Sequence, residues 1–236
     1  MIIVNCAQGS EEWHAARVGA ITASMFKTAR ERLKSGKNAG AYKAAAKDYA
    51  FRVACERIGG QPLDEGFSTW AMRRGHELEP EARAAHEMTA GIDVEPTGIV
   101  LTDDRKFGGS ADGLIGDDGG SEYKCLVAPD RIRGILIDRD IDEFQDQVQG
   151  CLWLTGRAWW HFVLYCPALA PVGRDLIIHQ VERDDDYIES LESDLIAFDR
   201  LVGEYEEQIR SADTWLGRPI DDTAIPVAAP SAVGIF

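Results

Sequence analysis

The residues most able to do chemistry lie in one short stretch near the middle of the chain, GGSADGLIGDDGGSEYKC over residues 108–125. It places Asp112 before a glycine-rich turn, and Glu122 and Lys124 after it. Hydrolysis of a phosphodiester needs a metal ion that polarises the phosphoryl group and lowers the pKa of a water molecule. Mg²⁺ prefers oxygen ligands, usually one or two carboxylates. The stretch is therefore either a metal-dependent hydrolytic site or a surface hairpin with ordinary charges.

The same stretch is predicted to form a β-hairpin that turns at the Asp-Asp-Gly-Gly of residues 117–120. Asp112 and Glu122 on neighbouring strands could then converge on one ion, and the carbonyl of Tyr123 could complete its ligand shell. Lys124 follows Glu122 by two residues, so both side chains point to the same face of the strand. A lysine in that position can orient the attacking water and offset negative charge.

Two further polar features could belong to this site. Glu79 precedes Pro80 in a helix predicted over 70–89, where the proline indicates a kink or restart; Glu79 is either a third metal ligand or a surface acid. Gln145 and Gln149 are four residues apart on a helix predicted over 141–155. They either reach a scissile phosphate or a metal-bound water, or they are solvated on the helix surface.

The elements that must position these residues alternate along the chain. Helices are predicted over 40–58, 70–89, 141–155 and 184–212, and strands lie between them over 92–127 and 157–182. This order predicts one α/β domain with a mixed sheet, spanning residues 1–222. The Ala/Pro-rich segment 223–236 is predicted to be a flexible tail.

Composition limits the classes of protein that remain. The net charge of −15 argues against nucleic-acid binding over the whole surface. Residues 13–57, however, carry ten lysines and arginines against three acids, so one basic groove is possible. No apolar run reaches the ~18 residues of a membrane span, and the first residues lack a secretion signal. Five cysteines without a CxxC pair indicate reduced thiols in a cytoplasmic protein with no membrane partner.

Six segments in order carry a family resemblance: EEWHAARVGAITAS, RRGHELEPEARAAHE, SADGL, EYKC, FQDQVQGCLWLTGRAWWHFVLYCP and VERDDDYI. Together they resemble the PD-(D/E)xK nuclease superfamily and, more narrowly, the phage lambda exonuclease family of viral-type recombination exonucleases. The resemblance covers about residues 10–210. It implies a restriction-endonuclease-like α/β core with a mixed central β-sheet flanked by helices.

The resemblance also implies roles for individual residues. Mg²⁺, or Mn²⁺ in its place, would be held as two ions, and Lys124 would activate the attacking water. The implied catalytic and metal-binding residues are Asp112, Glu122, Glu79, Lys124, Gln149 and, through its carbonyl, Tyr123. The expected 5′-phosphate and DNA contacts are Arg17, Ser24, Thr22, Gln147, Arg131 and Arg133.

Two of these DNA contacts come from physical reasoning beside the family pattern. Thr22 and Ser24 look like helix N-caps, and a helix N-terminus beside an arginine is a suitable phosphate site. The loop over 126–142 departs from the family, because the proline expected after Cys125 is delayed to Pro129. This loop carries Arg131 and Arg133, which could steer the downstream strand.

The function implied is a Mg²⁺-dependent 5′→3′ double-stranded DNA exonuclease of phage recombination. It would release mononucleotides from 5′-phosphorylated ends and leave 3′ single-stranded overhangs. The family further implies a homotrimeric ring around DNA and a single-strand annealing protein as partner. Two alternatives stay open: a structure-specific DNA endonuclease on the same fold, and a non-catalytic protein that binds DNA ends.

Overall fold

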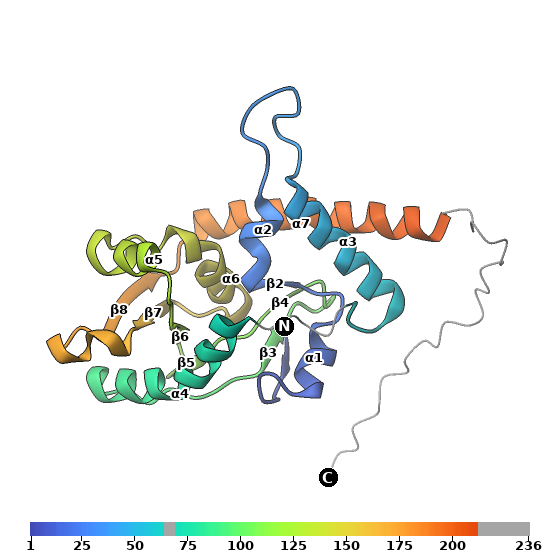
Figure 1. Cartoon of the computed structure of the whole chain (residues 1–236). Coiled ribbons are helices and arrows are strands. Elements are labelled where there is room, and N and C mark those ends of the chain that lie inside the picture. Colours follow the sequence, from blue (N-terminus) through green and yellow to red (C-terminus); the bar gives the residue numbers. More distant parts are fainter. Residues whose placement is uncertain (64–68, 212–236) are drawn as a thin grey trace, which may run out of the picture.

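The computed structural model describes residues 1–63 and 69–211, so the tail predicted over 223–236 lies outside the described residues. Within them, two four-stranded mixed sheets are flanked by helices (Figure 1). The predicted α/β class with mixed pairing is confirmed. The restriction-endonuclease-like core with its flanking helices is confirmed as well, and its strands form two sheets, with the chain passing from one sheet to the other between β4 and β5.

The first sheet has the strand order β1-β3-β4-β2. β2 and β4 are parallel, and the other neighbours are antiparallel. Ile99 and Leu101 of β3 are buried under it with Ala20 in a small core of their own. The strands are β1 (Ile2–Val4), β2 (Ile21–Thr22), β3 (Ile99–Leu101) and β4 (Phe107–Gly109).

The second sheet has the order β5-β6-β7-β8, with β6 and β7 parallel. β5 and β6 form the predicted hairpin, in which Gly113 lies opposite Ser121. Asp112 lies immediately before β5, on the segment that crosses from the first sheet to the second. The strands are β5 (Gly113–Ile115), β6 (Gly119–Lys124), β7 (Trp159–Tyr165) and β8 (Leu176–Glu182).

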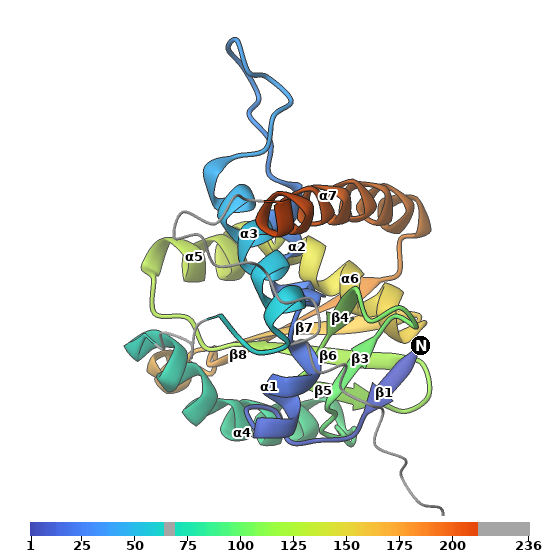
Figure 2. The ribbon, with the colours of Figure 1, turned by 90° about the vertical axis from the view of Figure 1, so that its right-hand side faces the viewer.

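Helices cover opposite sides of the sheets (Figures 1 and 2). α3 and α7 pack against each other on one side, and α4 contacts β6, β7 and β8 on the other. α4 continues through Pro80 as one element, so the predicted restart does not occur, although its ribbon changes direction in Figure 1. The helices are α1 (Glu11–Arg17), α2 (Phe26–Arg30), α3 (Ala44–Gly59), α4 (Trp70–Ala90), α5 (Pro129–Arg133), α6 (Gln145–Thr155) and α7 (Asp185–Ser211).

The main core lies between the second sheet and the helices α2, α3, α6 and α7. Its fully buried side chains include Phe26, Trp160, Phe162 and Phe198. The apolar spacing along α7 places Leu191, Leu195, Phe198 and Val202 inward, as the sequence predicted. This packing fixes α6 against the start of α2, and both elements border the candidate site.

Candidate active site

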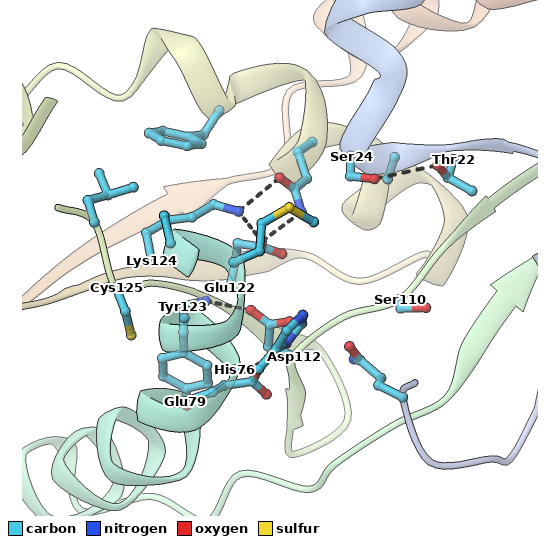
Figure 3. A pocket seen from close by; sticks show the side chains of 18 of the residues that line it. Thr22, Ser24, His76, Glu79, Ser110, Asp112, Glu122, Tyr123, Lys124 and Cys125 are labelled. Carbon is cyan, nitrogen blue, oxygen red and sulfur yellow. Dashed lines mark hydrogen bonds and ion pairs between the residues drawn. The ribbon is translucent and has the colours of Figure 1, made fainter. Parts of the chain in front are cut away.

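A cavity of about 530 Å³ opens where the end of β6, α4, α6 and the 3-10 helix Ala23–Met25 meet (Figure 3). Nearly all the predicted site residues line it. Those lining residues are Arg17, Thr22, Ser24, Glu79, Asp112, Glu122, Tyr123, Lys124, Arg131 and Gln147. Of the residues that the sequence offered for the site, Arg133, Gln145 and Gln149 are not among the lining residues.

Glu122 is the most buried acid of the cavity, with 3% of its surface exposed. Its Oε1 accepts hydrogen bonds from Lys124 Nζ and from Gln147 Nε2, each at 2.6 Å. Its Oε2 is buried and has no hydrogen-bond partner among the described residues. A buried carboxylate oxygen without a donor is costly. A cation bound at Oε2 would remove that cost, so the donor set fits a divalent ion.

Asp112 supplies the second carboxylate. Its Oδ2 accepts from the backbone N–H of Tyr123 at 2.7 Å, and its own N–H donates to the Ser121 carbonyl at 3.2 Å. Burial, and then the negative charges of Glu122 and Glu79, raise the pKa of Asp112 well above its usual value. A cation at this site would reverse that effect, because it favours the ionised carboxylate.

The Tyr123 carbonyl is available to the same ion. In an extended strand the N–H and C=O of one residue point to the same edge. Since the Tyr123 N–H points at Asp112, its carbonyl also faces Asp112. The Tyr123 side chain lies elsewhere, with its hydroxyl 2.9 Å from His86 Nδ1. Two carboxylates and a carbonyl are the kind of ligands that Mg²⁺ uses.

Lys124 is held by both of its polar neighbours. Its Nζ donates to Glu122 and, at 3.2 Å, to Gln147 Oε1. Burial lowers the pKa of Lys124, but the charges of Glu122 and Asp112 outweigh burial and leave that pKa raised. Lys124 is therefore an ammonium ion at neutral pH, suited to orient water and to offset negative charge.

Glu79 reaches the cavity from α4, but its carboxylate is already paired. Its Oε1 lies 3.0 Å from Arg83 Nη2, and burial raises the pKa of Glu79. Across residues 1–63 and 69–211, no group of three or more His, Cys, Asp or Glu side chains is arranged as a metal cluster. A direct bond from Glu79 to a metal therefore stays a prediction.

The site glutamine is Gln147, and the placement predicted for Gln149 is wrong. Gln149 is buried on another side of α6, where its Nε2 donates to the Glu182 carbonyl and its Oε1 accepts from the Asp184 N–H. It ties α6 to the connection between β8 and α7. Gln147, two residues earlier, bonds both Glu122 and Lys124.

The far end of the cavity carries a cation without a carboxylate partner. The Arg17 guanidinium stacks on Trp13 at 4.0 Å from the ring centroid, and Trp13 Nε1 donates to Ser110 Oγ at 2.8 Å. No ion pair of Arg17 occurs within the described part of the chain. Thr22 Oγ1 lies 3.4 Å from Ser24 Oγ on the neighbouring wall (Figure 3).

The N-cap prediction for these hydroxyls is corrected. Thr22 precedes the 3-10 helix Ala23–Met25, but its side chain makes no capping hydrogen bond. Ser24 lies inside that helix, and α2 begins only at Phe26. The two hydroxyls line the cavity and contact each other instead of capping the backbone.

The two arginines of the 126–142 loop lie in different environments. Arg131 lines the cavity, where it donates to Glu143 at 2.9 Å and lies 5.1 Å from the centroid of Phe144. Arg133 is exposed and pairs with Asp138 at 2.8 Å. The loop folds into α5, a π-helical turn over Gly134–Asp138 and a 3-10 helix over Asp142–Phe144, which turns Arg133 outward.

Several residues that line the cavity were missed by sequence reasoning, among them three polar or aromatic side chains. His76 lies three residues before Glu79 on α4, a spacing that could have revealed it. Gln8 also lines the cavity, and its Nε2 donates to the Ala111 carbonyl at 2.7 Å, beside Asp112. Trp13, which stacks on Arg17, is four residues earlier on α1, also a spacing of one helical turn.

Asp112, just before β5, and Glu122 and Lys124 on β6 bring two carboxylates and a lysine together on a mixed α/β fold, which defines a nuclease with the restriction-endonuclease-like fold. Residues 12–158 match the family described as the YqaJ-like viral recombinase domain. The chain thus belongs to the lambda exonuclease family of recombination exonucleases.

Solved structures agree with this assignment. LHK-Exo in complex with dAMP is 32% identical, with a TM-score of 0.74, over 85% of this chain and 96% of that one. The alkaline exonuclease LHK-Exo from Laribacter hongkongensis is 33% identical, with a TM-score of 0.72, over 85% and 97%. A phage-related exonuclease from Haemophilus somnus 129PT, at 16% identity, TM-score 0.64 and coverage of 80% and 96%, shares the fold.

The search of curated proteins found no match. Among the described helices, none combines the length and apolar character that crossing a membrane requires.

Proposed function

We propose that the chain is a Mg²⁺-dependent 5′→3′ exonuclease that acts on double-stranded DNA ends. It releases mononucleotides and leaves a 3′ single-stranded overhang. The observation that carries the proposal is one cavity with two chemically different ends. Asp112, Glu122 and Lys124 lie at one end, Ser24 lies across the cavity from them (Figure 3), and Arg17 also lines the cavity.

The hydrolytic end is built for phosphodiester chemistry. Asp112, Glu122 and the Tyr123 carbonyl would hold the ion, which when bound polarises the phosphoryl group and lowers the pKa of a water molecule. The Lys124 ammonium offsets the negative charge that develops on the phosphoryl oxygens. Gln147 holds the side chains of Lys124 and Glu122 in position relative to each other through its two hydrogen bonds, at 3.2 Å and 2.6 Å.

The other end supports selection of the 5′-phosphate. A terminal phosphate carries more charge and more free oxygens than a 5′-hydroxyl, so an unpaired arginine with a nearby hydroxyl binds it better. Arg17 is pre-oriented by its stack on Trp13, which limits the entropy lost on binding. A strand held by its 5′-terminal phosphate would present the next phosphodiester to the acids, which gives the 5′→3′ direction.

The rest of the prediction belongs to the same proposal. A homotrimeric ring around DNA, a single-strand annealing partner, a second metal ion, use of Mn²⁺ and a cytoplasmic location all follow from the family. Analytical ultracentrifugation of the purified chain tests the ring, since a monomer or dimer would contradict it.

The decisive experiment measures release of nucleotides from linear duplex DNA in Mg²⁺. It compares 5′-phosphate with 5′-hydroxyl ends, includes a closed circle, and uses Lys124→Ala as the control variant. Degradation of the phosphorylated linear duplex, lost in Lys124→Ala, supports the proposal. Cutting of the circle at an equal rate would replace the exonuclease with an endonuclease. Absence of any cleavage would favour a non-catalytic end-binding protein.

A further inference from the structure

Arg83 makes a contact that the reaction described so far leaves unused. It lies on α4 one turn after Glu79. Its Nη2 donates to Glu79 Oε1 at 3.0 Å and to the backbone carbonyl of Asp112 at 2.9 Å. One nitrogen atom therefore links the acid on α4 with the backbone of the acid that precedes β5. Figure 3 shows Glu79 and Asp112 beside each other in the cavity.

The backbone of Asp112 needs such a contact. β4 ends at Gly109 and β5 begins at Gly113, so Asp112 lies on the crossing between the sheets and outside both strands. Its N–H bonds the Ser121 carbonyl and its carboxylate bonds the Tyr123 N–H. The carbonyl of Asp112 is the third polar group of the residue, and it accepts a hydrogen bond from Arg83.

The part of α4 that carries Arg83 is itself held in place by packing. His86, three residues after Arg83 on α4, is fully buried, and its Nδ1 lies 2.9 Å from the Tyr123 hydroxyl. This contact holds α4 against β6, the strand that carries Glu122. The distance from Arg83 to Asp112 is thus set by packing and does not depend on a mobile surface side chain.

The distribution of charge in the cavity gives Arg83 a second effect on Asp112. Three acids line the cavity, and two of them have a cation as partner: Glu122 has Lys124 and Glu79 has Arg83. Among the described residues, the Asp112 carboxylate accepts a hydrogen bond only from the backbone N–H of Tyr123. Pairing Glu79 with Arg83 reduces its repulsion of Asp112. The Asp112 carboxylate and Glu122 Oε2 are left as the oxygens with room for a cation.

We propose that Arg83 is a positioning residue of the metal site, which fixes the backbone of Asp112 relative to Glu79 and thereby sets the ligand geometry. The inference rests on the proposed metal dependence. Groups that orient metal ligands through hydrogen bonds typically change metal affinity by about 10- to 100-fold when they are removed. Arg83 acts through Asp112 and Glu79 and is not placed against the substrate.

The test is calorimetric titration of the metal-free protein with Mn²⁺ and with Mg²⁺. Arg83→Gln is expected to weaken binding by about 10- to 100-fold. At saturating metal its kcat returns toward that of the wild type, and its KM for DNA stays the same. Arg83→Lys keeps the charge but lacks the planar fork, so it is expected to bind more weakly than the wild type. Wild-type affinity in either variant would overturn the inference.

Arg157→Gln is the matched control. Arg157 Nη1 donates to the carbonyls of Gly116 and Gly119, at 2.8 Å and 2.6 Å, at the turn of the same β5–β6 hairpin. Both substitutions remove an arginine that holds backbone carbonyls, so both lower the Tm. Only Arg83→Gln is expected to lower metal affinity, and an equal loss in Arg157→Gln would overturn the inference. A wild-type protein that binds neither ion would overturn the proposed metal dependence first, and Arg83 with it.

Discussion

Two glutamines on α6 are separated by only two positions and have unrelated tasks. Gln147 bonds Lys124 and Glu122 in the cavity, whereas Gln149 is 1% exposed and bonds the backbone of Glu182 and Asp184. Residues two apart on a helix point about 200° away from each other. The same amide therefore contacts the acid and the lysine of the candidate site at one position and holds backbone groups of the fold at the other.

Replacing each glutamine by leucine separates these tasks. Gln147→Leu is expected to lower kcat by about 10²-fold, in the range seen when one donor of a preorganised site is removed. Its free energy of unfolding should change little. Gln149→Leu leaves a buried carbonyl and a buried N–H unpaired, so unfolding should become easier by about 1–3 kcal/mol. Nucleotide release and urea denaturation measure the two effects, and the reverse pattern would contradict the assignment.

Arg17→Ala tests the other end of the cavity. The variant should lose the preference for 5′-phosphorylated over 5′-hydroxyl ends while it keeps metal-dependent cleavage, because the hydrolytic residues are untouched. Competition between the two duplex ends in one reaction measures the preference. Ser110→Ala, which removes the hydroxyl that accepts from Trp13 Nε1, is the milder comparison. An unchanged preference in Arg17→Ala would show that the phosphate binds elsewhere.

At the scale of elements, the site depends on how closely α6 approaches the start of α2. Gly150 of α6 makes this approach possible. A Cβ at that position would lie 2.5 Å from Phe26 Cδ2 and 3.7 Å from the Cβ of Ala23. Phe26 and Ala23 are both buried and border Ser24. A side chain at Gly150 would therefore push apart the two elements that carry Gln147 and Ser24.

Gly150→Ala should destabilise the protein by about 1–3 kcal/mol through this overpacking, although alanine is the better helix former. Gly203→Ala on α7 is the matched control, because a Cβ there meets nothing within 4 Å. It should stabilise the protein by roughly 0.5–1 kcal/mol. Chemical denaturation of both variants measures the change in the free energy of unfolding and its sign for each. A stabilising Gly150→Ala would show that the contact with Phe26 relaxes easily.

At the scale of the whole molecule, the acidic and basic parts of the chain neutralise each other. Arg30 and Arg57, both in the basic stretch over 13–57, form ion pairs with Asp194 and Asp199 of α7. These two arginines hold α7 against the rest of the domain, and their charges are neutralised by these ion pairs. The acidic helix thus reduces the number of cations free for DNA, and Lys34 and Lys37 are among the exposed ones that remain.

The acidic residues of the proposed metal site link stability to pH. The pKa of Asp112 is raised in the folded protein by burial and by Glu122 and Glu79. Between its usual pKa and the raised one, the native state binds more protons than the unfolded state, so the free energy of unfolding falls as pH rises. At alkaline pH, metal-free Asp112 is an ionised carboxylate that costs stability.

Two results should follow for Tm. In EDTA, Asp112→Asn should raise Tm, and the gain should grow as pH rises from about 4. Mg²⁺ should raise the Tm of the wild type more at alkaline than at acidic pH, because it binds the ionised carboxylate. The same ion should leave Asp112→Asn nearly unchanged. A metal-free Asp112→Asn that is less stable than the wild type at alkaline pH would contradict this account. Differential scanning calorimetry provides the measurement.

The sequence by itself determined what depends on neighbours along the chain. The period of apolar residues gave α3, α6 and α7 their inward faces, and the turn residues over 117–120 gave the β5–β6 hairpin. Glu122 and Lys124 share a face because strand side chains alternate with a period of two, so their ion pair at 2.6 Å was predictable.

Only the tertiary structure decided which residues from distant segments meet. In the folded protein the strands before and after Asp112 belong to different sheets, and Arg83 lies within hydrogen-bond distance of the Asp112 carbonyl. Gln147, and not Gln149, contacts Glu122, and Arg133 is exposed. The Arg83–Asp112 and Gln147–Glu122 contacts join residues 29 and 25 positions apart. The choice follows from the packing of whole helices against whole sheets. A local pattern can restrict which face a residue occupies, but what lies opposite that face is set by the rest of the chain.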